Sequence, residues 1–522
     1  MRKFNVTGVC VPNKNYMVDI GEKLKKIKDL IDRECYFTIN RARQYGKTTT
    51  LNMIPKTLSN DYICVKISFE GLGDESFASQ ELFCPTFIDQ IVRALHFTSI
   101  SKEYIEKWND GNITNFKLLS RHITEMCKDK KFVLMIDEVD RTSNNGIFLQ
   151  FISMLRTKFL DRQVNMDYTF HSVILAGVYD IKNIKLKMIN EGSYTPAPTE
   201  GKIYNSPWNI AVDFDVDMSF NPYEISTMLK EYEIDNNTGM DIAEISKEIY
   251  NYTAGYPFLV SRICQCIDEK LDRDWTLPGV QKAVNIIIYE KNTLFDDIYK
   301  NLTNNEELYQ LLYNMLILGE SYTFKIGNPV IDLAHMFGII KNKNGIAEVS
   351  NRIFEIIIYD YFISIDQTNI KTRKIKGVIS EVVKNGKFDM ELCLRKFADH
   401  YIEMFTEKDI KFLERHGRLL FLSYLRPFIN GEGHYHIESE TRNQRRMDIV
   451  VDYGNAQFII ELKVWRGEKY NQEAYEQLLN YMAIKKADTG YLLTFDFRKD
   501  INKHPKAEWV EFDGKRIFDV II

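Results

Sequence analysis

Three adjacent residues near the N-terminus have the types and order that can hold a triphosphate. Gly46, Lys47 and Thr48 follow the apolar run "CYFTI" and precede a helical pattern. The glycine lets the backbone approach closely, the ammonium contacts phosphate oxygens, and the hydroxyl ligates magnesium. Thr48 also begins the helix, whose first turn carries partial positive charge. The sequence predicts a phosphate-binding loop over residues 40–47, although a bare Gly-Lys-Thr also occurs by chance.

The carboxylates that such a loop needs end the stretch "KFVLMIDE", residues 131–138. Carboxylates at the end of a buried strand are costly unless they serve a cation. We assign Asp137 to the magnesium, through water, and Glu138 to the water that attacks the phosphate. The two motifs together, rather than either alone, predict nucleotide binding.

A second set of chemically active residues lies in the last 150 residues of the chain. Asp448 is near the start of "RMDIVVDY", and Glu461 and Lys463 are two residues apart in "QFIIELKVW". Residues two apart on a strand share one face. A divalent metal between Asp448 and Glu461 explains charges on an otherwise apolar strand, and Lys463 could position or deprotonate the attacking water. Gln477 lies on the helix predicted for 468–482, and "TGYLLTF" after it gives a third strand signal.

Some of these features also have a non-catalytic interpretation. Glu-x-Lys alone fits a half-exposed strand with a salt bridge. His434 and His436 lie in a Gly-rich stretch without partner ligands, so we interpret them as loop residues rather than metal ligands. Arg442, Arg445 and Arg446 fit phosphate contacts beside a cut site and a solvated surface equally well.

The elements that must position the first motifs alternate apolar runs with helix-length segments. This pattern predicts a parallel sheet that is covered on both faces. The predicted strands are 35–39, 62–69, 131–138 and 172–178. The segment "IAVDFDVDM", 210–218, alternates apolar and polar residues, and we predict a half-exposed strand there. The sheet is expected to end near residue 220.

Helical patterns follow the predicted sheet. Asn221, Pro222 and Glu224 have the types and spacing of a capped helix start. The stretch 333–354 predicts a helix, a strand, an Asn-Gly turn and a strand, the pattern of a winged-helix module. The short basic stretch "KTRKIK", 371–376, is a linker candidate.

Length and composition limit the class of protein. A chain of 522 residues is too long for one core. Its net charge of -5 argues against a globally basic nucleic-acid coat protein. The eight cysteines include no CxxC pair, which suits a reducing compartment. Without a signal-peptide pattern or an apolar run near the roughly 20 residues of a membrane helix, we expect a cytoplasmic protein and no membrane partner.

Residues 16–51 resemble bacterial AAA-ATPase-like proteins whose N-terminal region reads Tyr-Val-Asp-Lys-Thr and then Arg-Pro-Arg-Arg-Phe-Gly-Lys-Ser/Thr. The corresponding stretches are "YMVDI" and "RARQYGKT", and "IDEVDR" and "ILAGVYDIKNI" also fit. In that family the first loop glycine is routinely an arginine, here Arg41. The resemblance implies that Arg41 and Arg43 add charge near the nucleotide. It extends the binding loop to Gln44, Tyr45 and Thr49, although Ala42 and Gln44 depart from the family's proline and arginine.

The same resemblance suggests further nucleotide-site residues. Asp180 is nearest to the position of a γ-phosphate sensor. Arg262, in "GYPFLVSR", resembles the arginine of a lid-helix motif, with a surface or core-capping arginine as the alternative. Arg141 and Arg156 are candidates for an arginine finger.

The C-terminal pattern resembles the PD-(D/E)xK nuclease superfamily. Asp448, Glu461 and Lys463 match its motif, and Gln477 with Tyr481 on the next helix is typical of the RecB-like branch. The resemblance implies an upstream acidic metal ligand on a helix, for which Glu414 is the natural match.

The motifs and resemblances together predict an α/β protein of four parts. These are an AAA-like P-loop ATPase core at 1–220, a helical lid at 221–290, a winged-helix-like region at 291–370, and a PD-(D/E)xK nuclease-like α/β domain at 371–522.

The leading hypothesis is an ATP-dependent or ATP-regulated nuclease. It would use ATP with Mg²⁺, with Mg²⁺ or Mn²⁺ at the nuclease site, and act on nucleic acid, with DNA preferred over RNA. Two alternatives stay open: a nucleotide-driven signalling switch, and a nucleic-acid adaptor with a catalytically silent nuclease fold. Assembly as a homo-oligomer is also left open.

Overall fold

The computed structural model divides into two compact units, residues 1–280 with 335–338, and residues 281–334 with 339–522. The residues that it describes are 2–58, 61–109, 111–139, 146–178, 208–317, 320–369, 379–384, 386–404, 417, 420–422, 424–426, 428–429, 433–439, 447–454, 456–465, 468–496 and 506–522. Within these ranges, the side chains of some helix and strand residues, Asp448 among them, are also outside the description.

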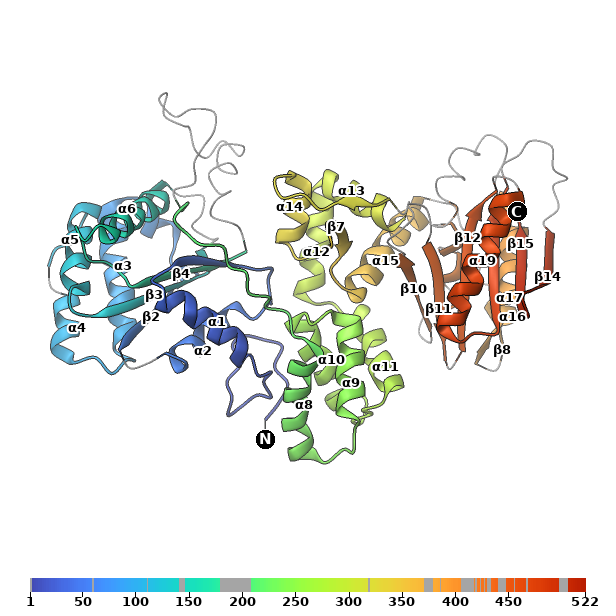
Figure 1. The fold of residues 1–522 in the computed structure, drawn as a ribbon, viewed down its shortest axis with the longest axis horizontal. Helices are drawn as coiled ribbons and strands as arrows, with labels where there is room; N and C mark the ends of the chain where they lie inside the picture. The colour runs from blue at the N-terminus through green and yellow to red at the C-terminus, as the bar shows by residue number, and fades with distance from the viewer. Residues whose placement is uncertain are drawn as a thin grey trace, which may run out of the picture. The chain divides into compact units, whose positions relative to one another are not determined.

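The first unit contains a four-stranded parallel sheet (Figure 1). Its strands are β1 (Tyr36–Asn40), β2 (Tyr62–Ser68), β3 (Lys131–Asp137) and β4 (Ser172–Gly177), in the order β1-β4-β3-β2. All four strand predictions are confirmed within one residue at each end. Because all four strands are parallel, their carboxyl ends meet at one end of the sheet. The loop after β1 and the end of β3 therefore lie at that same end, where ligands bind in open parallel sheets.

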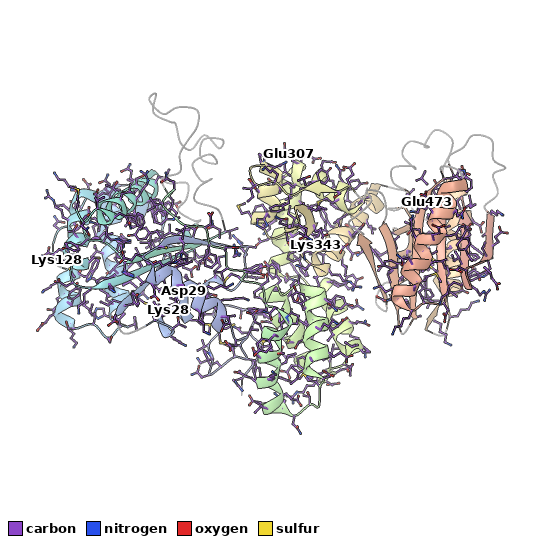
Figure 2. All side chains as sticks on the ribbon, viewed as in Figure 1. Lys28, Asp29, Lys128, Glu307, Lys343 and Glu473 are labelled. Atoms are coloured by element: carbon purple, nitrogen blue, oxygen red, sulfur yellow. The ribbon has the colours of Figure 1, made fainter. Side chains whose placement is uncertain are left out.

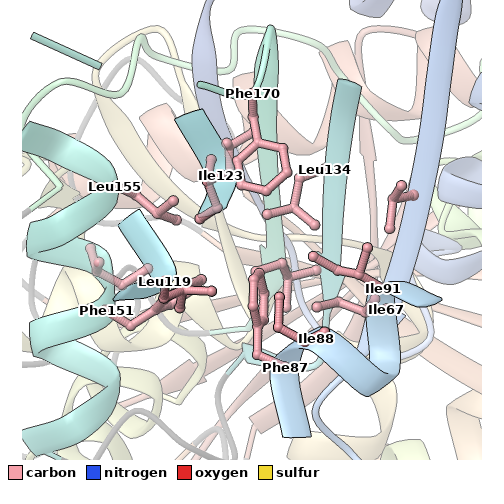
Figure 3. Close-up of a cluster of buried hydrophobic side chains, with 14 of the residues drawn as sticks. Ile67, Phe87, Ile88, Ile91, Leu119, Ile123, Leu134, Phe151, Leu155 and Phe170 are labelled. Atoms are coloured by element: carbon pink, nitrogen blue, oxygen red, sulfur yellow. The ribbon is translucent and has the colours of Figure 1, made fainter. Parts of the chain in front are cut away.

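Both faces of this sheet are buried, as the apolar runs predict. Neighbouring residues on a strand point to opposite faces, and in β3 both Leu134 and Met135 have no solvent exposure. Leu134 belongs to a continuous apolar core, and Figure 3 shows it with Phe87, Ile91, Leu119, Ile123, Phe151 and Leu155.

Four helices contribute residues to that core: α3 (Gln80–Leu95), α4 (Lys102–Asn109), α5 (Phe116–Cys127) and α6 (Gly146–Gln163). Two further helices, α1 (Gly21–Asp32) and α2 (Lys47–Met53), lie outside this cluster. The short 3-10 helices η1 (Ile54–Lys56) and η2 (Asp74–Phe77) complete the elements of this part of the chain.

The strand prediction for 210–218 is wrong. Val212 makes one isolated parallel bridge to Phe37, and its amide donates to the Tyr36 carbonyl at 2.9 Å, but no ladder follows. The Val216 carbonyl instead accepts a hydrogen bond from the guanidinium of Arg41 at 2.8 Å. The segment therefore pairs with β1 at one backbone bridge only. Beyond Val212, the Arg41 side chain joins it to the end of β1.

A bundle of helices follows, with α8 (Pro222–Asn236), α9 (Ile242–Thr253), α10 (Pro257–Lys270) and α11 (Leu277–Ile288). The capped start of α8 is confirmed. Asn221 Oδ1 accepts from the Glu224 amide at 2.9 Å, and Glu224 Oε2 accepts from the Asn221 amide at 2.8 Å. Glu224 also accepts from the buried ammonium of Lys23 at 2.7 Å, so the cap ties α8 to α1.

The next region has the winged-helix pattern predicted for 333–354. Its helices are α12 (Thr293–Asn304), α13 (Glu306–Leu316), α14 (Pro329–Met336) and α15 (Arg352–Asn369). Its strands are β5 (Tyr322–Thr323), β6 (Ile340–Lys343) and β7 (Ile346–Val349), in the order β5-β7-β6. Asn344 and Gly345 have φ of 53° and 85°, and two left-handed residues form the tight hairpin turn that the sequence predicts.

A six-stranded mixed sheet forms the C-terminal part of the second unit. The strands are β10 (Gly433–Ser439), β11 (Met447–Tyr453), β12 (Ala456–Val464), β13 (Thr489–Phe495), β15 (Lys515–Ile521) and β14 (Lys506–Phe512), in that spatial order. Strands β12 and β13 are parallel, and α19 (Glu468–Lys485) connects them. The remaining described elements are α16 (Ile379–Val382), β8 (Val383–Lys384), β9 (Lys387–Phe388) and α17 (Met390–Met404).

The placement of His434 and His436 in a loop is wrong, because both lie in β10, which pairs with β11. The β14–β15 hairpin was not predicted from the sequence. It turns at Asp513 and Gly514, whose φ values are 49° and 72°, and the Asp-Gly dipeptide is the usual signal for such a turn. Three of the six strands were therefore missed.

The outer surface carries charged side chains, and Figure 2 labels Lys128, Glu307 and Lys343, all exposed. Among the described helices, none has a stretch long and apolar enough to cross a bilayer. The predicted domain boundaries at 220, 290 and 370 are not tested by the division into two units and stay predictions.

We predict that Asn221→Ala destabilises the first unit by about 1 kcal/mol, because the Glu224 amide loses its cap acceptor. Asn221→Asp, which keeps a capping oxygen, should retain wild-type stability. The measurement is the urea dependence of unfolding for the two variants and wild type. Equal stability of Asn221→Ala and Asn221→Asp would contradict a role for the cap.

Candidate functional site

The loop between β1 and α2 folds around the ammonium of Lys47. Its side chain is buried, and Nζ donates to the carbonyl oxygens of Arg41 at 2.9 Å and Ala42 at 3.0 Å. Gly46 has φ of 76° and Gln44 has φ of 57°, so the loop turns through two left-handed residues. A Cβ placed on Gly46 would meet no atom within 4 Å, which leaves open space beside the loop. The ammonium is thus held inside a loop that has room next to it.

Arg41 is engaged at the base of this loop. Its guanidinium donates to the carbonyls of Asn40 and Val216, both at 2.8 Å, and lies over the ring of Phe214. Burial lowers the pKa of the Arg41 guanidinium. The predicted contact between Arg41 and a nucleotide stays a prediction, and the described contacts join the loop to the segment beside β1.

The other residues assigned to the loop contact different parts of the first unit. The hydroxyl of Tyr45 lies 2.7 Å from Ser219 Oγ, and burial raises the pKa of that phenol. The Arg43 carbonyl accepts from the hydroxyl of Tyr256. Thr49 Oγ1 accepts from the Cys10 amide at 3.3 Å. Thr48 is half-buried on the first turn of α2.

The two predicted carboxylates stand at the end of β3. Asp137 is 2% exposed, and its Oδ1 accepts from the Glu138 amide at 3.1 Å. Glu138 has φ of 55°, a left-handed conformation that costs a residue with a Cβ about 1–2 kcal/mol. Such strain persists where the surrounding structure demands it and is concentrated at functional sites. The geometry therefore agrees with a functional role for this strand end.

Lys66 is a component of this site that the sequence analysis missed. Its ammonium on β2 lies 3.7 Å from Asp137 Oδ2 and donates to Asn52 Oδ1 of α2 at 2.9 Å. Burial lowers the pKa of Lys66, and the charge of Asp137 partly offsets that effect. A lysine in the middle of the apolar run "YICVKISF" was a signal of the same kind as Glu461 in "FIIELKVW".

The residues present fit a nucleotide with its magnesium ion. Asp137 is a buried carboxylate, and the Lys66 ammonium lies 3.7 Å from its Oδ2. Thr48 and Lys47 follow the left-handed Gly46 as the predicted phosphate loop requires. This donor set is one that a hard divalent cation and phosphate oxygens prefer.

In the C-terminal sheet, three predicted residues gather on one face. Glu461 is 1% exposed, and both of its carboxylate oxygens are shielded from solvent. Lys463 Nζ lies 2.6 Å from Glu461 Oε1 and donates to Gln477 Oε1 of α19 at 3.0 Å. The alternative of a half-exposed strand is wrong, because Glu461 is buried, whereas the salt bridge between Glu461 and Lys463 that it included is present.

Asp448 lies directly opposite Glu461 in the β11–β12 pair. Directly opposed residues of antiparallel strands share a face, so the register agrees with the predicted pairing of the two acids. On the other side of Asp448 the register places Glu438 of β10, which the sequence analysis did not single out. The side chains of Asp448 and Glu438 are outside the described part of the chain.

Several predicted residues lie outside the described residues: Glu414, Asp180, Arg141, Arg442, Arg445 and Arg446. Among the side chains that the structure does describe, no three His, Cys, Asp or Glu residues gather into a metal-binding group. Arg262 on α10 donates to Gln265 Oε1 at 2.6 Å, and Arg156 on α6 donates to Asn209 Oδ1 at 2.7 Å. Neither contact is with the phosphate loop, and both assignments stay predictions.

Comparison with known proteins agrees with both sets of residues. A family model described as an AAA-like domain matches residues 16–362. The chain belongs to the AAA-like domain family. Residues 434–504 match the model of the PD-(D/E)XK nuclease superfamily, so this AAA-like protein carries a PD-(D/E)XK domain at its C-terminal end. Both resemblances inferred from the sequence motifs are confirmed.

Solved structures similar to this AAA-like protein include a Walker-type ATPase and an ORC2 protein. A Walker-type ATPase of Pyrococcus abyssi has a TM-score of 0.46 and 11% identity, over 68% of this chain and 99% of that one. The ORC2 protein of Aeropyrum pernix, in its ADPNP–ADP complexes, has a TM-score of 0.35 and 10% identity, over 70% and 98%. These values are too low to support a functional argument. No curated protein matches the chain.

We predict that Lys463→Met destabilises the second unit by about 3 kcal/mol, because it removes the cation from a buried carboxylate. The double variant Lys463→Met/Glu461→Leu should be more stable than Lys463→Met, since no buried charge is then left. Urea unfolding measures both effects.

The matched control for this experiment is Lys506→Met, because Lys506 pairs with Glu508 at an exposed position. Its effect should stay below about 1 kcal/mol. If Lys463→Met were no more destabilising than Lys506→Met, burial of the Glu461 charge would not be an energetic constraint on this sheet.

Proposed function

We propose that this protein is an ATP-dependent or ATP-regulated nuclease. The AAA-like part binds and hydrolyses ATP with Mg²⁺, and the C-terminal domain cleaves nucleic acid, DNA in preference to RNA, with Mg²⁺ or Mn²⁺. The observation that carries the proposal is the contact of Glu461, Lys463 and Gln477 on one sheet face, within a chain that also has a phosphate loop. A cytoplasmic location follows as part of the same proposal.

At the phosphate loop, Lys47 would exchange two backbone carbonyls for phosphate oxygens. Its Nζ lies inside the loop, 2.9 Å and 3.0 Å from the carbonyls of Arg41 and Ala42, which supports a role in holding phosphate there. Thr48 and Asp137 would hold the magnesium ion, which screens the negative charge of the phosphates. Glu138, in its left-handed conformation beside Asp137, would orient the attacking water.

At the C-terminal sheet, Asp448 and Glu461 would hold a divalent metal, which supplies Lewis-acid chemistry when bound. Lys463 would orient the attacking water or stabilise charge on the phosphate. Gln477 restrains the Lys463 ammonium through its Oε1, so that the cation stays next to Glu461. Because Glu461 is nearly inaccessible, the sheet excludes bulk water from the carboxylate that the metal needs.

We predict that Lys47→Ala weakens ATP binding at least about a hundredfold, because the loop loses its phosphate cation. Glu138→Gln should keep ATP binding and lose hydrolysis, since only the carboxylate can orient and accept a proton from the water. The measurements are equilibrium binding of ATP and release of phosphate. Lys26→Ala, at an exposed position of α1, is the control for charge removal. Unchanged hydrolysis in Lys47→Ala would eliminate this nucleotide site.

We predict that Glu461→Ala abolishes metal-dependent nicking of plasmid DNA while ATP binding stays at the wild-type level. Glu511→Ala, an exposed glutamate on β14, should nick at the wild-type rate. The assay compares DNA and RNA substrates with Mg²⁺ or Mn²⁺, with and without ATP. Nicking that persists in Glu461→Ala would place cleavage elsewhere. An intact wild type that binds ATP and cleaves neither substrate would support the signalling switch or the silent adaptor instead.

A further inference from the structure

Tyr256 contacts the phosphate loop from the helical bundle. It is the residue before Pro257, the first residue of α10, and it is 2% exposed. Its hydroxyl donates to the Arg43 carbonyl at 2.5 Å. Its ring packs edge-on against the ring of Tyr45, with 4.6 Å between centroids and an interplanar angle of 70°. Tyr256 thus contacts two residues of the predicted loop, Arg43 and Tyr45.

The conformation of the backbone before α10 places Tyr256 against the loop. Gly255 has φ of 76°, and a Cβ there would lie 1.9 Å from the Phe220 carbonyl oxygen, so only glycine fits. The Gly255 carbonyl accepts from the Phe220 amide at 2.8 Å, which fixes the approach. Pro257 then occupies the first turn of the helix, where its missing amide hydrogen carries no cost. Gly255, Tyr256 and Pro257 are therefore each explained, with the hydroxyl of Tyr256 directed at the loop.

The direction of the Arg43 carbonyl determines the direction of the next amide. A trans peptide is planar, and its C=O and N–H point in opposite directions. Since the Arg43 carbonyl points to Tyr256, the Gln44 amide points away from Tyr256. The two preceding carbonyls, of Arg41 and Ala42, point instead to Lys47 Nζ inside the loop. The Arg43 carbonyl therefore has a different donor, on a different element, from the two carbonyls before it.

We infer that Tyr256 is a positioning residue for phosphate binding, whose hydroxyl holds the Arg43–Gln44 peptide with its N–H turned toward the nucleotide. The inference rests on the proposed ATP binding and deepens it. Gln44, next in the chain, has φ of 57°, and the amides of a turn with such a left-handed residue can form a concave array that binds anions. The Tyr256 hydroxyl stabilises that array before the nucleotide arrives.

The contact between Tyr256 and the loop also couples the helical bundle to phosphate binding. If the Tyr256 hydroxyl favours the loop conformation that binds phosphate, then bound phosphate must favour the Tyr256 contact by the same factor. Nucleotide binding would thus strengthen the attachment of α10 to the loop. The coupling needs no residue of α10 to contact the nucleotide.

The test is Tyr256→Phe, which removes one oxygen and keeps the ring against Tyr45. We expect ATP affinity to fall about two- to tenfold, the range of one net hydrogen bond. Inorganic triphosphate, used as a competitor of ATP, should lose the same factor, because the effect acts on phosphate alone. The increase of melting temperature on adding ATP should fall in parallel, at matched ligand concentration.

Tyr232→Phe is the matched control, because Tyr232 is a buried tyrosine of α8 whose hydroxyl donates to Asp268 Oδ1 at 2.6 Å. It loses an equivalent hydrogen bond away from the loop, so it should lower the melting temperature without changing affinity for ATP or triphosphate.

The possible results distinguish the role of Tyr256 from the proposed binding of ATP. Wild-type affinity in Tyr256→Phe, with wild-type protein binding ATP, would overturn the role of Tyr256 alone. An equal loss in Tyr232→Phe would also overturn it, since the effect would be general packing of the bundle. Failure of the folded wild-type protein to bind ATP would overturn the proposed function and the inference with it.

Discussion

Both candidate sites depend on a carboxylate buried in a sheet next to a lysine of the same sheet. Asp137 faces Lys66 across β3 and β2 at 3.7 Å, and Glu461 contacts Lys463 along β12 at 2.6 Å. Removing such charges from water costs several kcal/mol per ion, and an apolar pair of similar volume would often be more stable. Burying these charges therefore costs the sheets folding free energy, and such buried charges are concentrated at sites of catalysis or binding.

The two pairs differ in a way that follows from their neighbours. The ammonium of Lys66 donates a hydrogen bond to Asn52 Oδ1 of α2 and lies 3.7 Å from Asp137 Oδ2. Lys463 is close to Glu461 and is held there by Gln477. A metal at the first site would join a carboxylate already loosely paired, whereas a metal at the second must share Glu461 with its lysine.

Local sequence signals predicted a large part of this fold, and long-range contacts account for what they missed. The four parallel strands, the Asn221 cap and the Asn344–Gly345 turn each depend on neighbouring residues, so their patterns were sufficient. The register of β10 depends on β11, and its polar residues gave no strand pattern. Lys66 and Tyr256 matter through partners in other elements of the fold, which no window of sequence shows.

The arginine that replaces the first glycine of the phosphate loop has a physical explanation. The left-handed positions of the loop are Gln44 and Gly46, whereas Arg41 has no positive φ and does not need glycine. A side chain is therefore tolerated at this position, and its guanidinium binds the carbonyls on either side of the strand edge. The contact with the Val216 carbonyl joins the loop to the segment 210–218, four residues beyond the isolated bridge between Val212 and Phe37.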